Sequence, residues 1–84
     1  ISMLKQTKYT DMNVAVLTLG AEILRVLKKP RSVKYDELFE RVVARRGVKA
    51  KPNFLPALSF LFLIDKIKYH QEVDVVELLN NENQ

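Results

Sequence analysis

The apolar and polar residues within 11–29 recur with the period of a helix, which predicts one long helix here. Asp11 or Asn13 is its expected N-cap, and Pro30 is expected to end it. The polar residues after the first turn recur at steps of four, three and four and form one narrow stripe: Thr18, Glu22, Arg25 and Lys29. The remaining surface is apolar along two lines of residues, with Val14, Leu17, Ala21 and Leu24 on one and Val16, Leu19, Ile23, Val26 and Leu27 on the other. So wide an apolar surface predicts that this helix packs against two neighbours.

The next segments predict a short strand and a second helix. Residues 31–35 contain the β-branched Val33 and lie between a proline and a capping residue, which indicates a strand or an extended linker. A helix then begins at Asp36, with an acidic first turn and a basic last turn that both suit the helix dipole. Gly47 ends it, because glycine accommodates the left-handed conformation that often follows a helix.

A third helix is predicted from about Phe54 to Ile64. Asn53 is its expected cap, and Pro56 is tolerated only within the first turn, where its missing amide hydrogen would have no partner. Beyond Asp65 the period changes from helical to alternating, and two apolar-rich stretches within residues 66–79, separated by a polar break, predict the strands of a hairpin.

This order of elements is that of a winged helix-turn-helix domain, a mainly helical α+β fold with three helices and a C-terminal β-hairpin wing. The alternative is a three-helix bundle with a disordered tail, which explains the hairpin pattern less well. We expect one domain over residues 3–80, since 84 residues support a single modest core, and a disordered polar tail over residues 81–84.

Composition and charge narrow the function classes. The chain has no cysteine and one histidine, which excludes a disulfide framework and a thiolate zinc site. No run approaches the roughly 18 apolar residues of a membrane span, so we expect a soluble, cytoplasmic protein without membrane contact. The net charge of +4 divides into +7 over residues 1–51 and −3 over residues 52–84, a separation that suits association with phosphates or with an acidic protein surface.

The third predicted helix lacks the chemistry of a DNA-contacting helix. Between Asn53 and Ile64 it has no basic residue and two polar side chains, whereas base edges and phosphates are contacted mainly by Arg, Lys, Asn, Gln, Ser and Thr. We expect an inward face of Ala57, Leu58, Leu61 and Ile64. Large apolar residues that remain on the third and first helices form the predicted protein interface: Leu55, Phe60, Phe62, Leu63, Val16 and Ile23. The alternative is that the hairpin and the first helix bury the whole third helix.

A basic cluster around the end of the second helix is the candidate nucleic-acid contact: Arg41, Arg45, Arg46, Lys49 and Lys51. The simpler interpretation is a solvated face, because Arg45 and Arg46 complement the helix dipole and Arg41 lies at ion-pair spacing from Glu37.

No catalytic, metal or cofactor site is predicted. His70 has no cysteine to activate and lies on the presumed wing, where a solvated strand residue is the simpler interpretation. The carboxylates of the hairpin region lack the spacing of a calcium loop, and they suit a solubilised wing: Asp65, Glu72, Asp74 and Glu77. We therefore expect a protein that is not an enzyme.

Residues 8–11, 19–24 and 57–67 resemble the small middle component of bacterial ABC three-component systems. The resemblance implies a winged-helix-like protein that works with an SMC-like ABC ATPase and a variable effector component in a conflict or anti-phage defence module. Asp65 departs from the pattern, since such families often carry a glycine before the wing.

The leading hypothesis is a non-catalytic adaptor whose first and third helices bind these protein partners, with the basic end near DNA held by the assembly. The alternative is a homodimeric winged-helix transcription regulator, in which the first helix forms the dimer seam and the basic cluster contacts the phosphate backbone. A third hypothesis is an antitoxin or phage-encoded inhibitor that occupies the surface of a partner.

Overall fold

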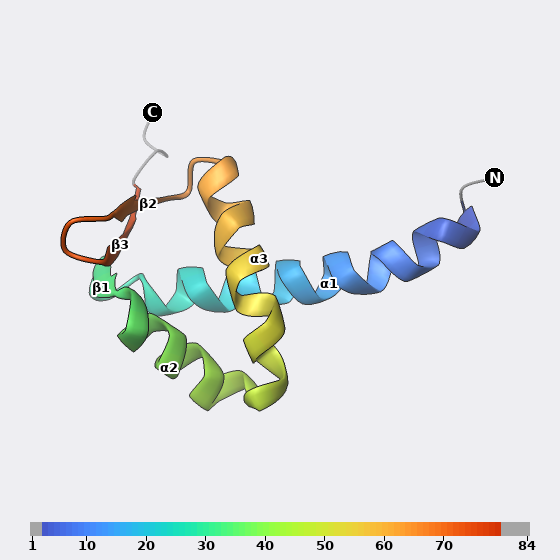
Figure 1. Cartoon of the computed structure of the whole chain (residues 1–84), viewed down its shortest axis with the longest axis horizontal. Coiled ribbons are helices and arrows are strands. Elements are labelled where there is room, and N and C mark those ends of the chain that lie inside the picture. The colour runs from blue at the N-terminus through green and yellow to red at the C-terminus, as the bar shows by residue number, and fades with distance from the viewer. Residues whose placement is uncertain (1–2, 80–84) are drawn as a thin grey trace.

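Three helices and a small antiparallel sheet make up the fold (Figure 1). The computed structural model describes the backbone of residues 3–79 and the side chains of residues 14–79. The elements are α1 (Met3–Val26), β1 (Ser32–Lys34), α2 (Tyr35–Arg46), the 3-10 turn η1 (Val48–Ala50), α3 (Lys51–Leu63), β2 (Ile67–His70) and β3 (Val75–Leu78). The predicted α+β, mainly helical class is confirmed, and the arrangement of three helices with a small antiparallel sheet is consistent with the predicted winged helix. The predicted tail, residues 81–84, lies outside the described residues.

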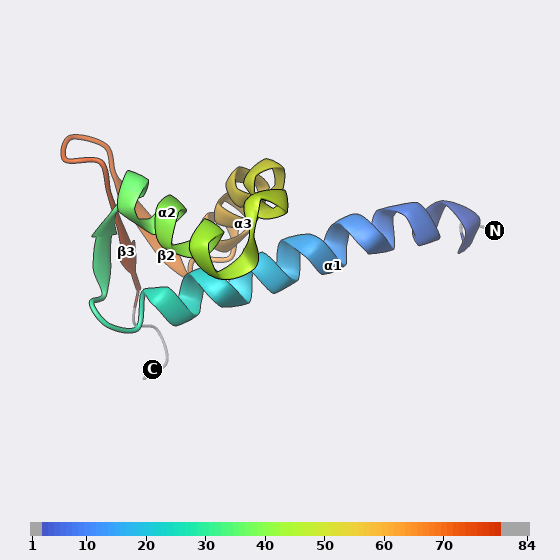
Figure 2. The same ribbon diagram turned by 90° about the horizontal axis from the view of Figure 1, so that it is seen from below.

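The long helix α1 crosses beneath α3, and its N-terminal half runs beyond the other elements (Figures 1 and 2). Its C-terminal half packs against α3 and α2, the two neighbours that its wide apolar surface predicts. The predicted start at Asp11 was wrong, because the helix begins at Met3 and residues 3–10 contain neither glycine nor proline to interrupt it. It ends at Val26 instead of Lys29, since a residue before proline disfavours the helical conformation.

The start of α2 differs from the predicted one by a residue. Its N-cap is Lys34, in an extended conformation and without a side-chain cap, so Asp36 lies inside the first turn. There its carboxylate still complements the helix dipole. Gly47 ends the helix as predicted: its φ of 93° is in the left-handed region, and its N–H donates to the Val43 carbonyl at 2.7 Å.

The start of α3 also differs from the prediction. The helix begins at Lys51, so Asn53 is a helical residue and not a cap. Pro52 occupies a first-turn position, where proline is well tolerated, and this allows the earlier start. Pro56 consequently lies in the interior of the helix and not in its first turn. Because proline has no amide hydrogen, the hydrogen bond from residue 56 to the Pro52 carbonyl is lost.

The hairpin strands form a three-stranded sheet with β1, in the order β1-β3-β2. Val76 of β3 lies opposite Val33 on one side and Tyr69 on the other. Residues 31–35 therefore contain a strand and not only a linker. The sheet lies beside the C-terminal end of α1 (Figure 2).

The core lies where α1, α2, α3 and one face of the sheet meet. Its largest fully buried side chains come from every layer: Phe54, Ile23, Leu27, Leu38, Val42 and Val76. The packing of this core determines which side chains of α1 and α3 remain exposed to solvent.

Candidate protein-binding surface

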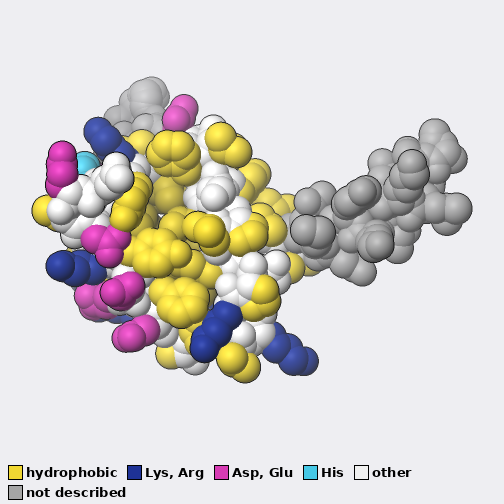
Figure 3. Space-filling view, viewed as in Figure 1, with side chains coloured by type: hydrophobic (Ala, Val, Ile, Leu, Met, Phe, Trp, Pro, Cys, Tyr) yellow, Lys and Arg dark blue, Asp and Glu magenta, His cyan; other side chains and the backbone are white. Residues whose placement is uncertain are grey.

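The outer side of α3 exposes large apolar side chains. Leu55, Phe62 and Leu63 are 57%, 54% and 76% exposed, and Ile64 after the helix is 44% exposed. The spacing of Leu55, Phe62 and Leu63 places them on one side of α3, away from the buried Ala57 and the rest of its core face, and Ile64 extends the exposed apolar surface beyond the end of the helix. We call these four exposed residues the α3 face. Figure 3 shows hydrophobic side chains gathered in a band over this part of the molecule.

A hollow of about 330 Å³ lies between α3 and the sheet, beside the α3 face. Its lining is apolar or aromatic apart from one serine: Tyr35, Leu55, Leu58, Ser59, Phe62, Ile67, Tyr69 and Val76. The Tyr35 ring meets the Tyr69 ring edge to face, with centroids 6.5 Å apart. We call this site the α3–sheet hollow.

One end of the α3–sheet hollow is acidic. The Tyr69 hydroxyl donates a hydrogen bond to the Asp74 carboxylate, and the Tyr35 N–H donates to the Asp74 carbonyl at 2.9 Å. The hydrogen bond to Asp74, with the nearby negative charges of Asp74 and Asp36, raises the pKa of Tyr69. The Asp74 carboxylate therefore contacts the lining at Tyr69, and Asp36 is close enough for its negative charge to act on the same hydroxyl.

The placement of the predicted interface residues is mixed. On α3, Leu55, Phe62 and Leu63 are exposed, whereas Phe60 is half-buried and packs against the core. Ile64 was expected to face inward and is exposed instead, because α3 ends at Leu63 and Ile64 leaves the helical face. Sequence reasoning missed Phe54, which is buried because the earlier start of α3 places it one full turn inside the helix.

On α1 the two apolar lines have opposite environments. Ile23, a predicted interface residue, is fully buried in the core, and this removes it from an accessible surface. Val16, also predicted, is half-buried against the core. The line through Val14 and Leu17 faces outward instead, with both side chains just over half exposed. We call Val14, Leu17 and the exposed Ala21 the α1 face.

The polar stripe of α1 explains this orientation, because it faces the basic end of α2. Glu22 is only 4% exposed, and its Oε2 lies 2.6 Å from Nε of Arg45. Arg25 and Lys29 line a cleft together with Arg41 and Arg45. Since a buried carboxylate needs a compensating cation, the Glu22–Arg45 pair favours packing of the polar stripe on α2 and exposure of the α1 face.

The residues of the predicted basic cluster lie at several places around α2 and the start of α3. Arg41 pairs with Glu37 at 2.7 Å, as its spacing predicts, and Arg45 pairs with Glu22. Arg46 and Lys49 line a separate shallow hollow with Thr18 and other residues of α1, η1 and α3. Lys51 is exposed in the first turn of α3. Two of the five predicted cations thus have carboxylate partners.

Replacing Arg45 with alanine is expected to lower the free energy of unfolding by about 1–2 kcal/mol, because it leaves the Glu22 carboxylate buried without its cation. The estimate is reduced for the exposure of Arg45, whose side chain is 57% accessible. Urea unfolding of R45A, E22Q and the double variant measures the coupling. A double variant as unstable as the sum of the single ones would contradict a direct interaction.

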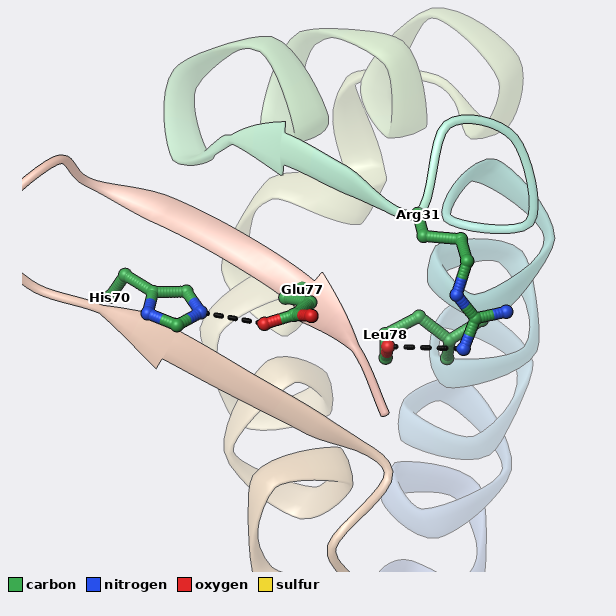
Figure 4. A network of polar contacts seen from close by, with 4 residues as sticks. All are labelled: Arg31, His70, Glu77 and Leu78. Atoms are coloured by element: carbon green, nitrogen blue, oxygen red, sulfur yellow. Dashed lines mark hydrogen bonds and ion pairs between the residues drawn. The ribbon is translucent and has the colours of Figure 1, made fainter. Parts of the chain in front are cut away.

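The hairpin carries a second polar network, on the side shown in Figure 4. Nε2 of His70 lies 2.7 Å from Oε1 of Glu77, and the Arg31 guanidinium donates to the Leu78 carbonyl at 3.3 Å. These contacts tie β2 to β3 and the start of β1 to β3. Within the described residues there is no group of three or more metal-ligating side chains, and no helix is long and apolar enough to cross a membrane.

Comparison with protein families finds a match over the C-terminal part of the chain. The family model of the ABC-three component (ABC-3C) system Middle Component 8 matches residues 31–79, from the start of β1 to just after β3. Neither the curated proteins nor the solved structures give a significant match. The matched region contains every residue that lines the α3–sheet hollow, whereas α1 precedes it.

Proposed function

The chain belongs to the Middle Component 8 family of ABC-three component systems, and we propose that it acts there as a non-catalytic adaptor that binds the other components through its exposed apolar surfaces. The proposed partners are the SMC-like ABC ATPase and the effector component of a bacterial defence complex. The α3 face would bind one of them, and the α1 face offers a second contact.

The exposure of the α3 face carries this proposal. Leu55, Phe62 and Leu63 are large side chains, and each leaves more than half of its surface in water. Soluble monomers rarely expose large apolar side chains in a cluster, and such a cluster usually marks a protein interface. The adjoining hollow adds aromatic side chains, which are common among the residues that dominate binding energy.

The electrostatics of α3 favour a protein partner over DNA. Beyond Lys51 the helix has no basic residue, and the hollow beside it is bordered by Asp36 and Asp74. Phosphates would be repelled at that end. Of the basic cluster, Arg41 and Arg45 already have carboxylate partners. A homodimeric DNA-binding regulator therefore has less support than the adaptor.

The test is co-expression of this chain with the ATPase and effector components proposed as its partners. We expect a complex to form and expect L55D or F62D to weaken it at least tenfold, because each places a charge at a desolvated contact. Both side chains are exposed, so the variants are expected to keep the fold. Binding is measured by calorimetry and folding by circular dichroism.

V48D is the matched control. Val48 is an equally exposed apolar residue, at 63%, but it lies in η1 and lines none of the hollow. The adaptor proposal fails if neither component binds the wild-type chain, or if V48D and F62D weaken binding equally. Salt-sensitive binding of duplex DNA by the isolated chain, lost in R46A, would instead support the regulator.

A further inference from the structure

The residues in and around the α3–sheet hollow indicate the chemistry of its binding partner more closely than the exposed α3 face alone does. Its lining carries no charged side chain, so the interior suits apolar groups. Leu55 and Phe62 lie at the lining and on the exposed α3 face at the same time. An occupant that enters the hollow therefore also covers part of the α3 face.

The charges around the hollow are unevenly placed. Asp74 contacts Tyr69 through its carboxylate and Tyr35 through its carbonyl, and Asp36 follows Tyr35 directly in the chain. On β2, Ile67 and Tyr69 line the hollow, while Lys68 lies between them and projects from the opposite face of the strand. Figure 3 shows acidic side chains along one flank of the apolar band, with a few Lys and Arg side chains among them and others at the bottom of the band.

We propose that the α3–sheet hollow binds a segment of the partner protein that inserts bulky apolar side chains and places a Lys or Arg against Asp36 and Asp74. This inference rests on the proposed adaptor function and specifies the chemistry of the partner. Asp74 contacts the aromatic lining through Tyr69, and the negative charge of Asp36 acts on the same residue, so a cation is the group that complements this end of the hollow. The same charges disfavour an acidic or phosphate-bearing occupant.

Overlapping peptides that cover the sequences of the ATPase and effector components are the probe. Fluorescence anisotropy measures their binding to the wild-type chain and to a D36N/D74N double variant, at low and at high salt. Asn keeps the shape of Asp and tolerates the positive φ of 56° at position 74, so the double variant is expected to fold. E72Q, an exposed carboxylate in the same turn, is the control.

The expected result is that bound peptides contain bulky apolar residues next to Lys or Arg. Their affinity should fall about fivefold in D36N/D74N, as neutralising two exposed charge contacts implies, and should change little in E72Q. High salt should weaken binding to the wild type more than binding to the double variant.

Other results overturn the inference in distinguishable ways. Bound peptides that lack a cation, or that bind the double variant as well as the wild type, refute it and leave the adaptor function standing. The same holds if only the full-length component binds and D36N/D74N does not weaken that complex. A homodimer that F62D dissociates would assign the hollow to a second copy of the chain. If neither component binds the chain, the adaptor function fails and this inference fails with it.

Discussion

Replacing Phe54 with alanine is expected to lower the free energy of unfolding by about 3–5 kcal/mol, the largest effect in this protein. Phe54 is 1% exposed, and its ring lies edge to face with the rings of Tyr35 and Phe39, at 5.5 and 5.0 Å between centroids. Truncation removes the buried ring, leaves a cavity and breaks both aromatic contacts. A domain of this size has a total stability of roughly 4–13 kcal/mol, so the variant should unfold at much lower urea.

The same residue type at Phe62 provides the control for this prediction. Phe62 lies on α3 too, but it is 54% exposed, and F62A should cost about 1 kcal/mol or less. The two variants therefore separate stability from binding: F54A should lower the stability of the domain strongly, and F62A should keep a stable fold and bind the partner weakly. Equal losses of stability would contradict the burial of Phe54.

Phe54 also connects the core to the candidate site. Its contact with Tyr35 holds a ring that lines the α3–sheet hollow, and Tyr35 in turn packs against Tyr69. A milder change such as F54L should therefore weaken partner binding by more than its loss of stability explains, because the wall of the hollow is less well positioned.

Most of the fold could be predicted because the hydrophobic period changes along the chain. The alternation that begins near Ile67 predicts the hairpin, and the apolar period before Pro30 predicts a helix with two neighbours. The helix ends were less predictable, since several residues compete for each cap. Asn53 is a good cap by type, yet Lys51 and Pro52 start α3 earlier and make Asn53 helical.

The candidate site was predictable only in part, because its geometry depends on contacts between distant residues. The exposed side of α3 follows from a helix with more apolar surface than a small core can cover, and this predicts Leu55 and Phe62. The α3–sheet hollow does not follow, since Tyr69 and Val76 join it through the position of the sheet. The orientation of α1 does not follow either. Both of its lines are apolar, and the Glu22–Arg45 pair links residues far apart in sequence.

The orientation of α1 gives the second large effect: I23A is expected to lower the free energy of unfolding by about 2–4 kcal/mol. Ile23 is fully buried between the helices, so truncation leaves a cavity that the packed core closes only partly. L17A is the matched change on the same helix, and because Leu17 is 52% exposed it should cost less than about 0.5 kcal/mol. Urea unfolding followed by circular dichroism measures both.

The comparison between these variants decides which line of α1 is available to a partner. If α1 is oriented as described, I23A reduces binding only through the unfolded fraction, and stabilising the fold with an osmolyte restores it. L17D, on the α1 face, should then leave folding intact and weaken any partner that contacts this helix. The opposite pattern, a stable I23A that fails to bind beside an unstable L17A, would mean that α1 presents its other apolar line to the partner. The Glu22–Arg45 pair could not form in that orientation, so E22Q would then leave stability unchanged.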